Sequence, residues 1–108
     1  MGKGNGTKVV AEPKLRTQTR ESYKPANRAK ILVVDDEEPV RQLLATLLKS
    51  LGYVPLTAET GLSALMQLRR EPVDVILLDV VLPGLSGYEI LDEIKRDQHL
   101  HNIPVLMI

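Results

Sequence analysis

The sequence predicts an α/β domain built on a mostly parallel β-sheet. Short apolar segments alternate along the chain with amphipathic helical segments, an order that implies right-handed crossovers between parallel strands. The segment Val75–Leu78 is apolar at every position, as expected for a strand covered on both faces of a sheet. Asp79 follows it directly, and ligands of open α/β sheets bind at the carboxyl ends of the strands. Asp79 is therefore the first functional candidate.

Composition limits the class of protein. The 108 residues suggest one domain, and with 44% hydrophobic but only 3% aromatic residues its core must consist of Leu, Val and Ile. The chain has no cysteine, which excludes disulfides and thiolate metal sites. No apolar run approaches the roughly 20 residues of a membrane span, and the polar N-terminus does not resemble a secretory leader. We expect a cytoplasmic protein that does not enter membranes.

The net charge of zero hides an asymmetry. Residues 1–30 hold eight Lys or Arg and two Glu, which gives that segment +6 and leaves −6 for the remainder. Residues 1–28 are rich in glycine and lack apolar periodicity, so we expect a disordered basic extension before a domain at residues 29–108. Only Tyr23 accompanies these basic residues, so a solvated leader is favoured over a nucleic-acid-binding arm.

The first half of the domain shows two strands and two helices. Residues 30–34 form the first strand, Pro39 suits the first turn of a helix, and Gly52 suits its end. In between, apolar residues recur with helical spacing at Val40, Leu43, Leu44, Leu47, Leu48 and Leu51. Residues 53–58 form a second strand, which Pro55 places at a sheet edge. The second helix starts at Thr60-Gly61 and ends at residues 69–72, and its expected inward residues are Leu62, Leu65, Met66 and Leu68.

The second half continues the alternation. After the strand that ends at Asp79, residues 87–96 form a third helix with the apolar stripe Ile90, Leu91 and Ile94. Residues 103–108 form a last strand. His99 and His101 have metal-ligand spacing, but they precede this strand, at the end of the sheet opposite Asp79. We expect them in a solvated loop.

Two strands of the predicted sheet end in carboxylates, at Asp35-Asp36 and at Asp79. If these strands are neighbours, about 5 Å apart, the three carboxylates converge on one small volume and repel one another. Mg²⁺ prefers such hard oxygen ligands, and Asp79 could then act as a carboxylate nucleophile toward a phosphoryl group. Taken singly, Asp35-Asp36 could be only an acidic helix start and Asp79 only a capping residue; the combination is far more specific.

At these residues the chain resembles the response-regulator receiver domain of two-component signalling. That family's first strand, acidic pair and first helix are similar to KILVVDDEEPVRQLL, and its third strand, phosphoacceptor and loop are similar to VDVILLDVVLPGLSGYEIL. Its second strand and helix are similar to YVPLTAETGLSAL, and its fourth strand to IPVLMI. The resemblance covers residues 30–108 with every element in order.

The resemblance implies a flavodoxin-like, doubly wound parallel sheet with strand order 2-1-3-4-5. It implies a signalling module rather than an enzyme, in which Asp79 accepts a phosphoryl group from a sensor histidine kinase or a phosphotransfer protein. Asp36 and Asp79 would bind Mg²⁺ through their carboxylates, with the backbone carbonyl of Val81 as third protein ligand. Asp35 would act mainly through a metal-bound water.

The sequence stops at Ile108, before the family's fifth strand and last two helices, so we expect an incomplete sheet of order 2-1-3-4. In the family, a Ser or Thr that senses the phosphoryl group ends the fourth strand, and a Lys that pairs with this group ends the fifth. Neither has a counterpart in this sequence, so we expect weak phosphorylation. A bare fourth strand also predicts marginal stability and self-association. One alternative stays open: an interaction module without phosphoryl chemistry, whose sheet a partner chain completes.

Overall fold

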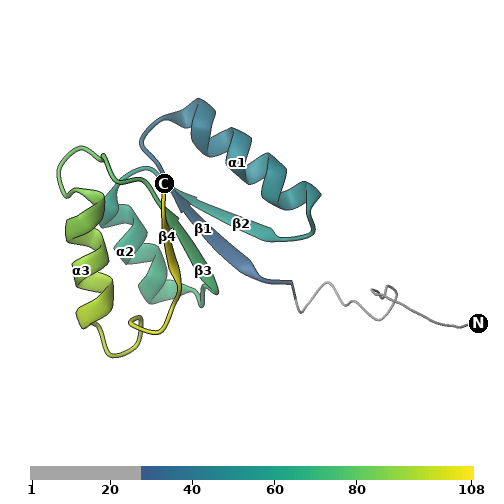
Figure 1. Cartoon of the computed structure of the whole chain (residues 1–108). Coiled ribbons are helices and arrows are strands. Elements are labelled where there is room, and N and C mark those ends of the chain that lie inside the picture. Colours follow the sequence, from purple (N-terminus) through teal and green to yellow (C-terminus); the bar gives the residue numbers. More distant parts are fainter. Residues whose placement is uncertain (1–27) are drawn as a thin grey trace, which may run out of the picture.

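We describe residues 28–108 of the chain from a computed structural model. They form four strands and three helices in strict alternation (Figure 1). The elements are β1 (Lys30–Val34), α1 (Glu38–Ser50), β2 (Val54–Ala58), α2 (Gly61–Arg70), β3 (Val75–Leu78), α3 (Gly87–Arg96) and β4 (Val105–Met107). The predicted basic extension, residues 1–28, lies outside the described residues except for Arg28.

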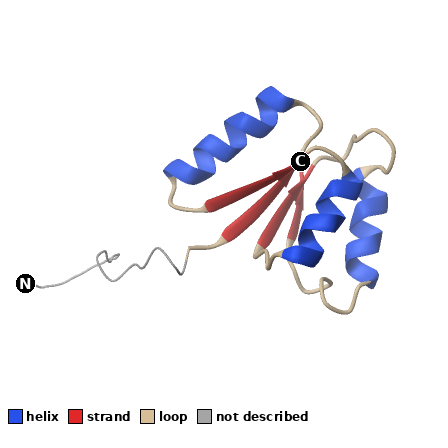
Figure 2. Cartoon of the chain, turned by 180° about the vertical axis from the view of Figure 1, so that it is seen from behind, coloured by secondary structure: helices blue, strands red, loops and turns tan. Residues whose placement is uncertain are grey.

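The strands form one parallel sheet with the order β2-β1-β3-β4, which confirms the predicted flavodoxin-like arrangement. Pro55 lies in the edge strand β2, where its missing N–H leaves the pairing with β1 intact. Helix α1 covers one face of the sheet, and α2 and α3 cover the other (Figures 1 and 2). Residues after a strand therefore meet at a common sheet edge, close to the start of each helix.

The main hydrophobic core lies between the sheet and helices α2 and α3. Strand side chains that point to this face are fully buried, and they contact apolar residues of both helices: Leu32, Val34, Ile76, Leu78, Ala64, Leu68, Ile90 and Ile94. Each large side chain buried in this way contributes about 1.5–3 kcal/mol relative to an exposed one. The predicted stripe of the third helix is confirmed, because Ile90 and Ile94 are buried and Leu91 packs against the cluster.

The opposite face of the sheet is only half covered, which corrects the expectation that β3 is buried on both sides. Val75 and Leu77 are half-buried, and Leu106, paired with Leu77 in register and so on the same face, is 56% exposed. The reason is that α1 lies over β1 and β2 (Figure 1). No other helix of residues 28–108 lies on this face. Three leucines of the predicted helical stripe are consequently exposed: Leu43, Leu47 and Leu51.

Helix α2 departs in part from its predicted orientation. Leu62 and Met66, expected to point inward, are 63% and 51% exposed. Leu68 is buried and Leu65 packs against the core, as predicted, and the other buried positions of the helix are Gly61 and Ala64. A Cβ atom at Gly61 would lie 2.3 Å from Cδ1 of Ile90, so α2 approaches α3 too closely for any side chain at that position unless Ile90 shifts.

The ends of the helices agree with the sequence signals. Thr60 and Ser86 each form a capping box with the residue three positions on, which satisfies two amide groups at the start of α2 and of α3. Gly52 follows α1 with a φ of 94°, a left-handed conformation that glycine adopts readily. Within residues 28–108, no helix has the length and hydropathy needed to cross a bilayer.

Candidate functional site

The predicted acidic residues lie together at the carboxyl edge of the sheet. Asp35 and Asp36 follow β1, Asp79 follows β3, and these two strands are hydrogen-bonded neighbours in parallel register. The ladder continues beyond the strand ends, because the Asp79 amide donates to the Val34 carbonyl at 3.0 Å. The Asp35 amide likewise donates to the Ala58 carbonyl of β2 at 3.2 Å. Main-chain hydrogen bonds thus fix where Asp35 and Asp79 leave the sheet.

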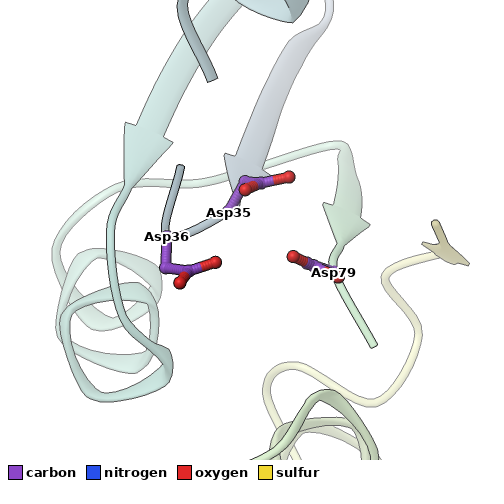
Figure 3. A group of neighbouring side chains, drawn as sticks. All are labelled: Asp35, Asp36 and Asp79. Atoms are coloured by element: carbon purple, nitrogen blue, oxygen red, sulfur yellow. The ribbon is translucent and has the colours of Figure 1, made fainter. Parts of the chain in front are cut away.

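The three carboxylates share one small volume. Each of Asp35, Asp36 and Asp79 offers one oxygen atom, and these oxygens all lie within 4.8 Å of one another. Figure 3 shows the three side chains directed toward a common space from the ends of β1 and β3. Asp35 is buried, Asp79 half-buried and Asp36 exposed, so the group is open to solvent on one side. The predicted meeting of these side chains is confirmed.

This arrangement concentrates negative charge. Two unit charges about 4 Å apart repel by roughly 1 kcal/mol in water and about 4 kcal/mol near a protein surface. Among residues 28–108, no Lys or Arg forms a salt bridge with any of the three aspartates. Several carboxylate oxygens at one partly solvated point are the donor set that Mg²⁺ takes in proteins. The residues present therefore fit a magnesium ion.

Nearby hydrogen bonds hold two of the carboxylates in place. Oδ1 of Asp35 accepts from the Glu37 amide at 2.9 Å, which turns the chain from β1 toward α1. Oδ1 of Asp79 accepts from the Val81 amide at 3.0 Å, so the phosphoacceptor candidate is bonded within its own loop. Val81 is 77% exposed and lies beside the acidic group. That its carbonyl binds the metal stays a prediction.

Sequence reasoning missed a contact from α1. Arg41 reaches back from the helix, and its Nη1 donates to the backbone carbonyl of Asp35 at 2.7 Å. The bond fastens the β1–α1 loop without using an aspartate side chain. A side-chain bond to a main-chain carbonyl six residues away leaves no pattern in the sequence that distinguishes Arg41 from any other surface arginine.

The loop after Asp79 is anchored to the rest of the domain at several points. Leu82 inserts into the main core, and the Val80 amide donates to the Ile108 carbonyl at 3.2 Å. Gly84 turns the chain with a φ of 77°, a left-handed conformation that glycine adopts readily. The Gly87 amide then donates to the Val80 carbonyl at 2.9 Å and closes the loop.

The two histidines lie elsewhere. His99 and His101 are exposed in the segment between α3 and β4, at the other end of the sheet, as predicted. Nδ1 of His101 lies 3.1 Å from the Asp97 carbonyl. Among the residues that the structure describes, neither histidine joins a group of metal-ligating side chains.

Comparison with known proteins identifies relatives along the domain. Residues 31–108 match the family model of the response regulator receiver domain. The chain is 42% identical over 79 residues to the phosphate regulon transcriptional regulatory protein PhoB of Escherichia coli, and it is 38% identical over 81 residues to the probable transcriptional regulator ycf27 of Guillardia theta. These matches cover 73% and 75% of this chain but only 34% and 31% of the relatives. The chain thus spans about a third of their length.

Solved structures show the same fold. The N-terminal domain of a response regulator receiver protein from Methanoculleus marisnigri has a TM-score of 0.71 and 41% identity, over 72% of this chain and 63% of that one. The chemotaxis response regulator CheY4 of Vibrio cholerae has a TM-score of 0.73 and 33% identity, over 75% and 68%. Fold, acidic edge and sequence similarity agree, and the chain belongs to the response regulator receiver domain family of two-component systems.

Proposed function

We propose that residues 29–108 act as a phosphoacceptor domain, in which Asp79 takes a phosphoryl group from a sensor histidine kinase or a phosphotransfer protein. The observation that carries this proposal is the meeting of Asp35, Asp36 and Asp79, each with an oxygen within 4.8 Å of the others. Repulsion among three neighbouring carboxylates costs free energy unless a bound cation neutralises their charge. Phosphoryl transfer needs such charge neutralisation, and the positioning of the reacting groups, more than covalent help from other side chains. The domain is then a cytoplasmic signalling module rather than an enzyme.

The aspartates have different roles in this proposal. A carboxylate oxygen of Asp79 attacks the phosphorus, a P–O bond forms, and the P–N bond to the donor imidazole breaks. The Val81 amide keeps the Asp79 carboxylate oriented by its bond to Oδ1. Asp36 and Asp79 would hold Mg²⁺ directly with the Val81 carbonyl, and Asp35 through a water. When bound, the metal supplies positive charge that offsets the charge of the carboxylates and the phosphoryl oxygens.

The experiment measures phosphoryl uptake by the chain as it stands. The protein is incubated with a small-molecule acyl phosphate donor, with Mg²⁺ or with a chelator, and its intact mass is followed over time. We expect slow uptake of one phosphoryl group with Mg²⁺ only, in a form that hydroxylamine removes, as an acyl phosphate requires. Folded protein that takes up nothing, or that takes it up equally well with chelator, would contradict the proposal.

An interaction between two copies of the chain is a second candidate function, and the exposed edge of the sheet favours it. Strand β4 pairs with β3 on one side and, within residues 28–108, with no strand on the other. The segment from Asn102 to Ile108 has no charged side chain that would discourage pairing with another strand. A second copy could add its own β4 there and cover Leu106.

We expect this association to be sensitive to a charge on β4. In analytical ultracentrifugation the wild-type chain should sediment above its monomer mass with rising concentration, and Leu106→Lys should remain monomeric. Leu62→Lys is the matched control, because Leu62 is similarly exposed but lies on α2, over the opposite face of the sheet. A wild-type chain that stays monomeric at high concentration would rule this candidate out.

A further inference from the structure

Gly87, the first residue of α3, lies directly against the backbone of the proposed phosphoacceptor. A Cβ atom at this position would lie 2.2 Å from the Asp79 carbonyl oxygen and 2.8 Å from Cα of Val80. Cβ atoms in proteins essentially never come within 3.0 Å of such neighbours. Both neighbours here are main-chain atoms, which cannot rotate away as the end of a side chain can. The observed spacing therefore requires glycine.

The same residue also closes the loop by a hydrogen bond. The Gly87 amide donates to the Val80 carbonyl at 2.9 Å, so the start of α3 both touches and binds the Asp79–Val80 segment. Within the loop, the Val81 amide donates to Oδ1 of Asp79 at 3.0 Å. These two hydrogen bonds connect the start of α3 with the Asp79 carboxylate through the Val80–Val81 segment.

Gly61 provides a contrast within the same fold. It too is buried, begins a helix and leaves no room for a Cβ atom. Its nearest neighbours, however, are Cδ1 and Cγ1 of Ile90, at 2.3 and 2.5 Å. Gly61 therefore serves the packing of α2 on α3, whereas Gly87 contacts the main chain of the acidic site.

We propose that Gly87 is a positioning residue for phosphoryl transfer: its missing side chain lets α3 hold the Asp79–Val80 peptide and so sets the direction of the Asp79 carboxylate. This inference rests on the proposed function of Asp79. A Cβ atom at Gly87 would displace the segment by about 1 Å, and misplacement on this scale costs on the order of a hundredfold in rate.

The test compares Gly87→Ala with Gly61→Ala. We expect Gly87→Ala to lower the rate of phosphoryl uptake per folded molecule, at saturating Mg²⁺, by about a hundredfold, and Gly61→Ala to lower it far less. Circular dichroism gives the folded fraction of each variant. Amide resonances of Asp79 and Val81 should shift much further in Gly87→Ala than in Gly61→Ala, whose added Cβ meets only the Ile90 side chain. A folded Gly87→Ala variant with wild-type rate and resonances would overturn the inference.

If Gly87→Ala does not fold, a second pair of variants tests the inference. Ser86→Ala and Thr60→Ala each remove the capping side chain that starts a helix, but only Ser86 is next to Gly87. We expect uptake by Ser86→Ala to be several-fold slower than by Thr60→Ala, and equal rates would overturn the inference. If the wild-type chain takes up no phosphoryl group, the proposed function fails, and the amide resonances alone decide whether Gly87 positions Asp79.

Discussion

Asp79→Asn is expected to reduce phosphoryl uptake by several orders of magnitude, the scale on which loss of a nucleophile acts. An amide oxygen is a far weaker nucleophile than a carboxylate oxygen, and the change also removes one negative charge from the acidic group. The new side chain is nearly isosteric and can still accept the Val81 amide at Oδ1, so the loop should keep its shape. Intact mass after incubation with the donor and Mg²⁺ measures the effect.

The matched control for this variant is Asp74→Asn. Asp74 precedes β3 at the other end of the strand, where its Oδ2 accepts from the Lys30 amide at 2.7 Å. Both changes remove one charge beside the same strand, so a general effect of charge would appear in both. Uptake that persists in Asp79→Asn and disappears when Asp36 is also changed would move the acceptor role to another aspartate.

Ile76→Ala is expected to destabilise the domain by about 2–5 kcal/mol, a large share of the roughly 5–15 kcal/mol that holds a typical domain folded. Ile76 lies in the middle of β3, is completely buried and faces the core under α2 and α3. Removing most of its side chain leaves a cavity that neighbouring strands on both sides cannot fill by moving. The free energy of unfolding in urea, followed by circular dichroism, measures the loss.

Leu77→Ala is the control for that prediction. Leu77 is the next residue of the same strand, but it points to the half-covered face and is only partly buried. Its truncation removes less buried surface and opens no closed cavity, so the loss of stability should be clearly smaller. Equal losses for the two variants would show that the open face carries as much packing energy as the closed one.

The sequence was sufficient to predict the placement of the acidic site. Apolar segments that end in Asp35-Asp36 and in Asp79 are local patterns, and parallel pairing converts them into a shared edge without further information. Pro55 identified an edge strand for an equally local reason, its missing amide hydrogen. Predictions of this kind succeed because they depend on the backbone and hardly on how helices pack.

Helix orientation could not be predicted in the same way. In α2, apolar residues surround so much of the helix that several faces could have been the buried one. The side of Gly61 and Ala64 is buried because α3 approaches α2 closely there, and Leu62 and Met66 are exposed to solvent. The distance between two helices is a property of the assembled fold. The hydrogen bond from the Arg41 side chain to the Asp35 carbonyl was missed because it too depends on the assembled fold.

The bond from the Asp79 amide to the Val34 carbonyl has a consequence for how the domain folds. It joins segments separated by two helices and a strand, so the chain must close a long loop before the bond can form. Helical turns, by contrast, form from neighbouring residues and need no such closure. The acidic site should accordingly assemble late, and any opening that separates β1 from β3 should abolish it while helical structure persists.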